Sequence, residues 1–513
     1  MRSAKTFAEW RRNAIKVDQL EGMDMWRGSV ESKDYDYKLI RDRLNTLIGL
    51  KNDGSIRSVN QAMFLLRAGM IRNLGGICNH RLYRFSRVGT MQIIEDYIQV
   101  SEWHLTKIAE CDHPDIGLMA RVDFFSDMIR AYGRTALVLH GGASFGLCHL
   151  GVAKSLYEEG LLPKIVVGSY IGAVMAAAIC VQDERGLEAL FSEDETSGKL
   201  DLTAFRKPGG IIGSVVRKLL RFARHGCLLD VKVVEESARR TIGDITFKEA
   251  YFRSGRILNI IVHSKQKLDV PVLLNYLTAP DVVVWSAASA SCAVPGLYET
   301  VTLYAKCPDT GLIRPWHPTA IRMESAFLQT DIPVSRLAEL FNVNNFIVSQ
   351  VPSYFSIQIS PSEEATSFGS KMIKLFGDEL GHRYTQFKQL GLVPTRLQYF
   401  ERFFHAPLPG DITISPSISF GDFFHVVQNP TPAFVQYCIQ KGEQSVWKRM
   451  MQVRIRSELE YSLERKLDLL KQKQSAGKSV MRSSVDSVFG NVSPGVNTNS
   501  NVQLKHRTRS FEL

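Results

Sequence analysis

The chain has 513 residues, which is too long for one ordinary core and predicts two or three structural units. Hydrophobic residues make up 45% and charged residues 22%, an ordinary globular balance that excludes a chain disordered throughout. The formal net charge of +11 suits an anionic membrane surface or nucleic acid equally well, and it also fits a mildly basic soluble protein.

The cysteines and the N-terminus bear on the cellular compartment. Eight cysteines are scattered without a CxxC pair or a His/Cys cluster at ligand spacing, which predicts reduced thiols in an intracellular protein and no metal site. The first residues contain no long apolar core, so we expect no secretory signal. The apolar stretch 165–181 is short for a membrane span, and its glycines at 168 and 172 favour a buried strand that turns into a buried helix.

Residues 1–130 are predicted to form a helical N-terminal domain. In 35–50 and 59–74, apolar residues recur at a spacing of three to four among arginines and lysines. No stretch in this region has the pattern of a β-strand.

The pattern changes at Thr135, and residues 131–355 are predicted to be an α/β domain with a mainly parallel sheet. Short apolar runs alternate here with helical segments such as 144–160 and 281–291, which is typical of parallel strands joined by helices. The predicted strands are 136–140, 163–168, 257–263 and 344–351.

Helices are expected again in a C-terminal extension over 356–475, mainly at 367–390 and 432–470. The second is dense in opposite charges at helical spacing, which is typical of a solvated helix face. From 476 to 513 the composition shifts to Ser, Asn, Val and Gly without a period, so we predict a disordered tail.

Two glycine-rich turns follow successive predicted strands. The first, His140 to Gly146 (HGGASFG), exposes backbone N–H groups at a helix start, where they can bind phosphate or stabilise an oxyanion, although a plain tight turn would explain the glycines as well. Its candidate oxyanion residues are Gly141, Gly142, Ala143 and Gly146.

The second turn reads Gly168-Ser169-Tyr170-Ile171-Gly172 and has the spacing of a nucleophile elbow, G-x-S-x-G. The elbow glycines flank a strained central residue, whose side chain projects over the sheet edge. An oxyanion loop beside an elbow indicates acyl-transfer chemistry.

The pair of turns resembles the patatin-like phospholipase domain, and the resemblance covers roughly residues 5–465. Segments similar to the fungal and plant triacylglycerol-lipase branch are HGGASFG, LLNYLTAPDVVVWSAASASCAVPG (273–296), NNFIVSQV, GDITISPS (410–417) and, before the core, AEWRRNA, YDYKLIRDRL and LLRAGMIRNLGGICNHRLY. The resemblance implies an α/β patatin-like core with helical flanks. It also implies ester hydrolysis of triacylglycerol or phospholipid by a serine/aspartate dyad without a metal or organic cofactor, at a lipid-droplet or endoplasmic-reticulum surface.

Both dyad positions are substituted. The family places its serine nucleophile where this chain has Tyr170, with Ser169 just before it. The family aspartate stands in a D-G-(S/A) turn followed by L-x-x-D-L-P, and counting back from Asp331 places it at Ser325, with its turn glycine at Ala326. A tyrosine hydroxyl reaches further than a serine Oγ, and its ordinary pKa of about 10 makes it hard to deprotonate.

Two interpretations follow. The first is a lipid-binding or regulatory pseudoenzyme, whose partners would be a neutral-lipid or phospholipid surface and an active relative of the family. The second is a hydrolase or acyltransferase with a rearranged site that uses Ser169, Glu324 or His140. His149 is expected to be a core histidine.

Residues 211–225 (IIGSVVRKLLRFARH) form a candidate membrane-contact helix. An apolar stripe faces away from Arg217, Lys218, Arg221 and Arg224, so this helix either lies in an anionic lipid interface or packs on the core. No zinc-finger, RRM or helix-turn-helix signature is present, so nucleic acid is not an expected partner.

Overall fold

The structure of the chain is a computed structural model. The structure describes residues 4–141, 143–192, 231–264, 272–293, 298, 301–316, 323–325, 334–351, 410–416 and 431–489, with scattered residues between 375 and 392. In 143–144, 263–264, 323–325 and 477–489 only the backbone is described. The predicted helix 211–225 lies outside these residues, as do most of 367–390 and all of 490–513.

The N-terminal region is helical, as predicted, and several of its helices begin at a side-chain cap. Thr6 and Asp36 accept hydrogen bonds from the backbone N–H groups of Glu9 and Leu39, which satisfies donors that a helix start leaves free. The helices are α1 Phe7–Leu20, α2 Met23–Gly28, α3 Tyr37–Asp53, α4 Ile56–Gly69, α5 Gln92–Glu110 and α6 Leu118–Tyr132, with 3-10 turns at Leu74–Gly76 and His80–Tyr83.

The central domain is a mixed, mainly parallel sheet with the strand order β4-β3-β2-β1-β8-β9, in which β7 also pairs with β3. All pairings among β3, β2, β1, β8 and β9 are parallel, whereas β4 and β7 run antiparallel to β3. The strands are β1 Arg134–Gly141, β2 Ile165–Ser169, β3 Ile257–Ser264, β4 Val272–Leu274, β7 Met323–Ser325, β8 Val343–Val351 and β9 Ile412–Ile414, with a separate hairpin of β5 Tyr304–Lys306 and β6 Ile313–Pro315. The α/β prediction is confirmed.

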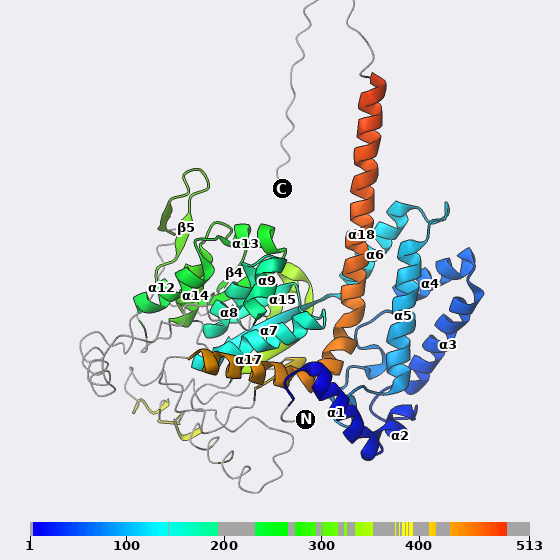
Figure 1. Cartoon of the computed structure of the whole chain (residues 1–513), viewed down its shortest axis with the longest axis horizontal. Coiled ribbons are helices and arrows are strands. Elements are labelled where there is room, and N and C mark those ends of the chain that lie inside the picture. Colours follow the sequence, from blue (N-terminus) through cyan, green and yellow to red (C-terminus); the bar gives the residue numbers. More distant parts are fainter. Residues whose placement is uncertain are drawn as a thin grey trace, which may run out of the picture.

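Helices cover both faces of this sheet, which is why its strands are apolar on both sides (Figure 1). One face packs against buried side chains of α7 (Cys148–Glu158), α8 (Ile171–Cys180) and α14 (Val284–Cys292). The other face packs against Leu337 and Phe341 of α15 (Val334–Phe341). The helices are α7 Cys148–Glu158, α8 Ile171–Cys180, α9 Glu184–Phe191, α12 Val231–Ile242, α13 Phe247–Ser254, α14 Val284–Cys292, α15 Val334–Phe341 and α17 Pro432–Trp447, and a 3-10 turn spans Ala143–Leu147. The helix predicted at 281–291 is α14, which begins three residues later than predicted, at Val284.

The last helix, α18 (Met450–Phe489), joins the two regions (Figure 1). Val453 belongs to the core of the α/β domain, whereas Ile455, Leu459, Leu463 and Leu467 pack with the N-terminal helices. The expectation of a solvated charged face is wrong for part of this helix, because Glu460 is 3% exposed.

The helix also passes residue 475, where we expected disorder to begin. It continues to Phe489 because the residues after 470 hold helix-compatible Lys, Gln, Ser and Ala, with one interrupting glycine at 477.

Within the part of the chain that the structure describes, no helix is long and apolar enough to cross a bilayer. The seven described cysteines are all free thiols, and five of them are buried.

Candidate active site

The second glycine turn adopts the backbone of a nucleophile elbow, with Tyr170 at its apex. β2 ends at Ser169, Tyr170 lies at φ 58° and ψ −133°, and α8 begins at Ile171. A non-glycine residue at this φ is strained, and such strain collects at functional sites. Among the described residues, Asn342 is the one other non-glycine residue with a positive φ.

Close packing explains the two elbow glycines. A Cβ at Gly168 would lie 2.5 Å from the Cα of Ala173, and a Cβ at Gly172 would lie 2.1 Å from the carbonyl oxygen of Leu139. Both distances are far below contact distance, so α8 approaches the sheet closely only because these positions lack side chains.

Hydrogen bonds to α14 hold the apex residue in place. The backbone N–H of Tyr170 donates to Ser291 Oγ (3.1 Å), and that hydroxyl donates to the carbonyl of Ile261 on β3 (2.8 Å). The thiol of Cys292 donates to the carbonyl of Tyr170 (3.0 Å), and burial raises the pKa of this thiol to about 12, which keeps it protonated. Sequence reasoning missed both residues, although the run of small residues SAASASC is the signal of a helix packed this tightly.

His140 lies beside the elbow and contacts two candidate residues. It is the register neighbour of Ser169 on the adjacent parallel strand, and its Nδ1 is 2.6 Å from Ser169 Oγ. Its ring packs edge-on against the ring of Tyr170, with centroids 5.1 Å apart. Burial lowers the pKa of His140 to about 4, so the imidazole is neutral at pH 7 and a weak base. The structure therefore brings His140, Ser169 and Tyr170 together.

The first glycine turn packs directly on this elbow. Gly141 lies at φ +80°, where a Cβ would be 2.8 Å from the carbonyl oxygen of Val351. A Cβ at Gly146 would be 2.3 Å from Ile171 Cγ2, so the loop contacts the first residue of α8. Ala143 begins the 3-10 turn, and Gly142 lies outside the described residues.

The position that the sequence motif assigns to the dyad aspartate lies on β7, which pairs with β3, the strand next to the elbow strand β2. Ser325 is the last residue of β7 and pairs with Val262 on β3, while Glu324 pairs with His263. Because Val262 follows Ile261, whose carbonyl anchors Ser291, the backbone of Ser325 lies at the same sheet edge as the elbow. Ala326 and Asp331 lie outside the described residues.

His149 is a buried core histidine in α7, as expected. Its Nδ1 is 2.8 Å from Ser349 Oγ on β8, and burial lowers its pKa to about 3. The remaining candidates, Arg217, Lys218, Arg221 and Arg224, lie outside the described residues. In the described part of the chain, no group of three or more His, Cys, Asp and Glu side chains could hold a metal ion.

The buried state of His149 predicts a pH dependence of stability. The unfolded imidazole titrates near pH 6.5, so between about pH 6.5 and 3 the unfolded state binds a proton that the folded state does not. The free energy of unfolding should therefore fall as the pH decreases, by on the order of 2 kcal/mol from this group at pH 5. Denaturant titrations at pH 7 and 5 should show a smaller loss for His149→Gln than for the natural protein. Equal losses would contradict the assignment.

Comparison with known proteins agrees with this architecture. A model of the patatin-like phospholipase family matches residues 137–320, and a domain of unknown function, DUF3336, matches residues 1–130. The α/β domain is therefore of the patatin-like class.

The relatives define the family more narrowly. Triacylglycerol lipase ptl3 of Schizosaccharomyces pombe is 35% identical over 454 residues, which cover 88% of this chain and 92% of that protein. This chain belongs to the patatin-like triacylglycerol lipase family. Triacylglycerol lipase SDP1L of Arabidopsis thaliana is 33% identical over 96% of this chain, and triacylglycerol lipase 5 of Saccharomyces cerevisiae is 30% identical over 93%. The chain spans 61% and 65% of the length of those two proteins.

The likeness to a solved structure is distant. The type III effector protein ExoU aligns over 71% of this chain and 68% of its own, with a TM-score of 0.29 and 15% identity, which is too remote to support an argument.

Proposed function

We propose that this chain acts at a lipid surface as a catalytically impaired family member, that is, as a lipid-binding or regulatory pseudoenzyme. The observation that supports this most directly is a tyrosine at the apex of an otherwise well-formed elbow. The elbow glycines and the strained backbone are present beside the glycine turn that we propose as the oxyanion loop, but the apex carries a tyrosine instead of a serine.

The chemistry of the site supports impairment. A serine Oγ at the apex would attack an ester carbonyl held by the oxyanion loop, whereas the ring of Tyr170 occupies space next to His140. The neighbouring imidazole has a pKa of about 4 and is too weak a base to deprotonate a phenol, whose ordinary pKa is about 10. The aspartate position holds Ser325, which cannot accept the proton in its place.

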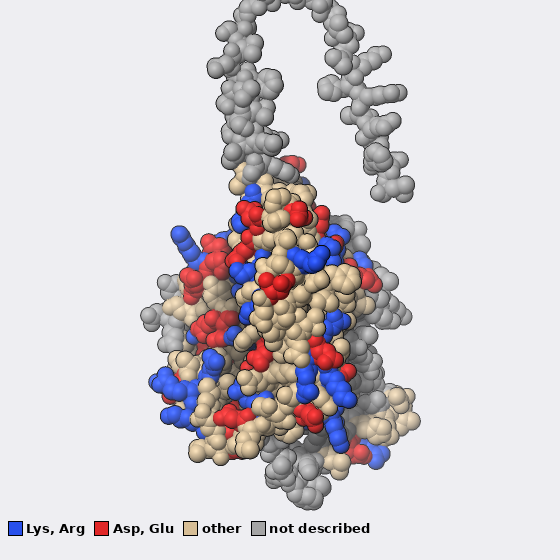
Figure 2. Space-filling view, turned by 90° about the vertical axis from the view of Figure 1, so that its right-hand side faces the viewer, with Lys and Arg blue, Asp and Glu red and all other residues tan. Residues whose placement is uncertain are grey.

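Lipid binding is supported by the family and by charge. Relatives named as triacylglycerol lipases make neutral lipid or phospholipid the proposed ligand class, and a lipid droplet or the endoplasmic reticulum the proposed location. On the face turned toward the viewer in Figure 2, Lys and Arg are interspersed with Asp and Glu, so the basic excess of +11 does not form one uniform field there. The basic helix 211–225 remains our candidate contact.

Flotation with lipid emulsions tests this proposal. We expect the full chain to float with triacylglycerol droplets coated with anionic phospholipid and to show ester hydrolysis no higher than buffer. Each basic residue near an anionic surface contributes about 1 kcal/mol to the binding free energy. A variant in which four basic residues are replaced by glutamine should therefore bind anionic droplets much more weakly. The residues replaced are Arg217, Lys218, Arg221 and Arg224. A chain that does not float, or that hydrolyses lipid at lipase rates, would contradict the proposal.

A second function, ester hydrolysis by a rearranged site, is favoured by one contact. His140 Nδ1 lies 2.6 Å from Ser169 Oγ, which is the distance that a nucleophile–base pair requires. Ser169 is only 4% exposed, however, and belongs to β2 rather than to the apex of the turn. A fluorophosphonate probe followed by peptide mass spectrometry separates the two functions. Labelling of Ser169 that disappears in His140→Ala would establish this second site, and we expect no label.

A further inference from the structure

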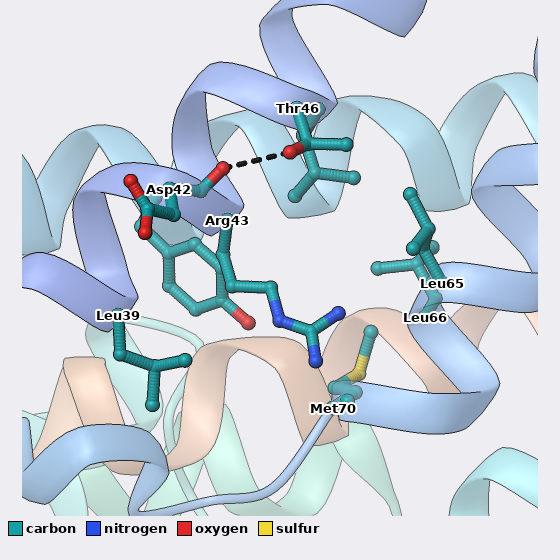
Figure 3. Close-up of a pocket in the computed structure, with 10 residues that line it drawn as sticks. Leu39, Asp42, Arg43, Thr46, Leu65, Leu66 and Met70 are labelled. Atoms are coloured by element: carbon teal, nitrogen blue, oxygen red, sulfur yellow. Dashed lines mark hydrogen bonds between the residues drawn. The ribbon is translucent and has the colours of Figure 1, made fainter.

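A cavity of about 200 Å³ lies in the N-terminal helical domain, among α3, α4 and α5 and away from the elbow (Figure 3). Its walls are mostly apolar. The apolar lining comes from Leu39, Leu47, Leu65, Leu66, Met70 and the ring of Tyr97. Leu39 and Leu65 are half-buried, so the cavity reaches the surface.

One cation projects into this apolar space. Arg43 runs between Leu39 on one side and Leu65, Leu66 and Met70 on the other (Figure 3). Its guanidinium lies on the backbone of Gly69, where a Cβ would be 3.0 Å from Arg43 Cζ, so the glycine makes room for the charged group. Among the described residues, no carboxylate forms an ion pair with Arg43.

The other polar groups of the lining leave this charge uncompensated. Asp42 is adjacent in sequence but exposed, and its side chain points away from the guanidinium (Figure 3). The hydroxyl of Thr46 donates to the backbone carbonyl of Asp42 (2.8 Å). Burial raises the pKa of Tyr97, with the positive charge of Arg43 opposing the shift, so the phenol is neutral and senses this charge.

We propose that this cavity binds a single-chain anionic amphiphile, with its head group on Arg43 and the start of its acyl chain along the leucines. A planar guanidinium matches a carboxylate or a phosphate through paired hydrogen bonds, and an apolar wall matches an acyl chain. A dry cavity of about 150 Å³ accommodates benzene, so this volume suits a head group and the first methylenes rather than a whole long chain. The inference is independent of any chemistry at Tyr170.

Binding of oleate to the full chain, measured by calorimetry below the micelle concentration, tests the proposal. Loss of a charge-assisted hydrogen-bonded pair should weaken binding about tenfold or more in Arg43→Gln. The matched control is Arg41→Gln, which removes an exposed arginine of the same helix that lies over the ring of Tyr37. This control should bind oleate like the natural protein.

Further ligands distinguish a carboxylate from a phosphate head group and test whether the acyl chain contributes to binding. Oleyl alcohol, which lacks the charge, and acetate or inorganic phosphate, which lack the chain, should bind at least tenfold more weakly than oleate. Lysophosphatidate that binds more tightly than oleate would identify a phosphate head group, and the reverse order would identify a carboxylate; both outcomes support the site. Leu65→Trp, which fills the cavity without changing its charge, should also weaken oleate binding. Equal oleate binding by Arg43→Gln, or acetate binding as strong as oleate binding, would overturn the proposal.

Discussion

The double substitution Tyr170→Ser/Ser325→Asp is expected to give a chain that hydrolyses emulsified triacylglycerol or phospholipid, whereas the natural chain is expected to show no measurable turnover. The elbow already has its strained apex, its two close-packed glycines and the adjoining oxyanion loop. A serine at φ 58° would place its Oγ over the sheet edge, and an aspartate at the end of β7 would lie at the same edge. We expect a gain of at least about a thousandfold over the natural protein, since losing a dyad member usually costs several orders of magnitude.

The single variants are the controls for this repair. Members of a catalytic unit act together, so Tyr170→Ser alone and Ser325→Asp alone should each show little activity. If the natural chain already turns over at lipase rates, the two positions are assigned wrongly and Ser169 becomes the first candidate nucleophile. If the repaired chain is folded, floats with lipid and stays inactive, the scaffold is impaired beyond these two residues and the prediction fails.

Replacing Arg72 by methionine is expected to destabilise the protein by about 3–5 kcal/mol, because it leaves a buried carboxylate without its partner. Arg72 Nη1 donates to Glu460 Oε2 (3.0 Å) and to the carbonyl of Arg456 (2.6 Å), and Nη2 donates to the carbonyl of Gly133 (3.0 Å). Glu460 Oε1 accepts the backbone N–H of Thr135 at the start of β1 (2.7 Å). The side chains of Arg72 and Glu460 are 8% and 4% exposed, and their hydrogen bonds join the N-terminal domain, the sheet and α18.

The same network makes the effect of Arg72→Met depend on pH. Burial already raises the pKa of Glu460, and Arg72 opposes that rise, so removing Arg72 should raise the pKa further. The folded state would then bind a proton that the unfolded state releases, so the deficit in stability should be smaller at pH 5 than at pH 8. Denaturant titrations at both pH values measure this deficit.

Two further variants test whether the deficit comes from the buried ion pair. Arg72→Met/Glu460→Gln should recover part of the loss, because it removes both charges. Arg67→Ala, which breaks the exposed pair with Asp127, should change stability by less than about 1 kcal/mol. An Arg72→Met variant as stable as this control would refute the prediction.

The sequence by itself determined the class of fold and the local form of the site. Apolar strands followed by glycine turns and helices predict a parallel sheet, because each element has its own periodicity and its own turn residues. The elbow was predictable for the same reason: Gly168 and Gly172 are needed by local close packing, and the family motif then assigns the apex to Tyr170. The helices of the N-terminal domain likewise follow from spacing and caps.

Only the tertiary structure decided which distant residues support these elements. Ser291 and Cys292 hold Tyr170 from more than 120 positions away, and Glu460 meets Thr135 across 325 positions, separations that no local pattern encodes. The charges of α18 suggested a solvated helix, yet both domains pack against part of it. Glu460 is buried there because Arg72 compensates its negative charge. The Arg43 cavity arises in the same way, from three helices packed around a cation whose surroundings depend on all of them.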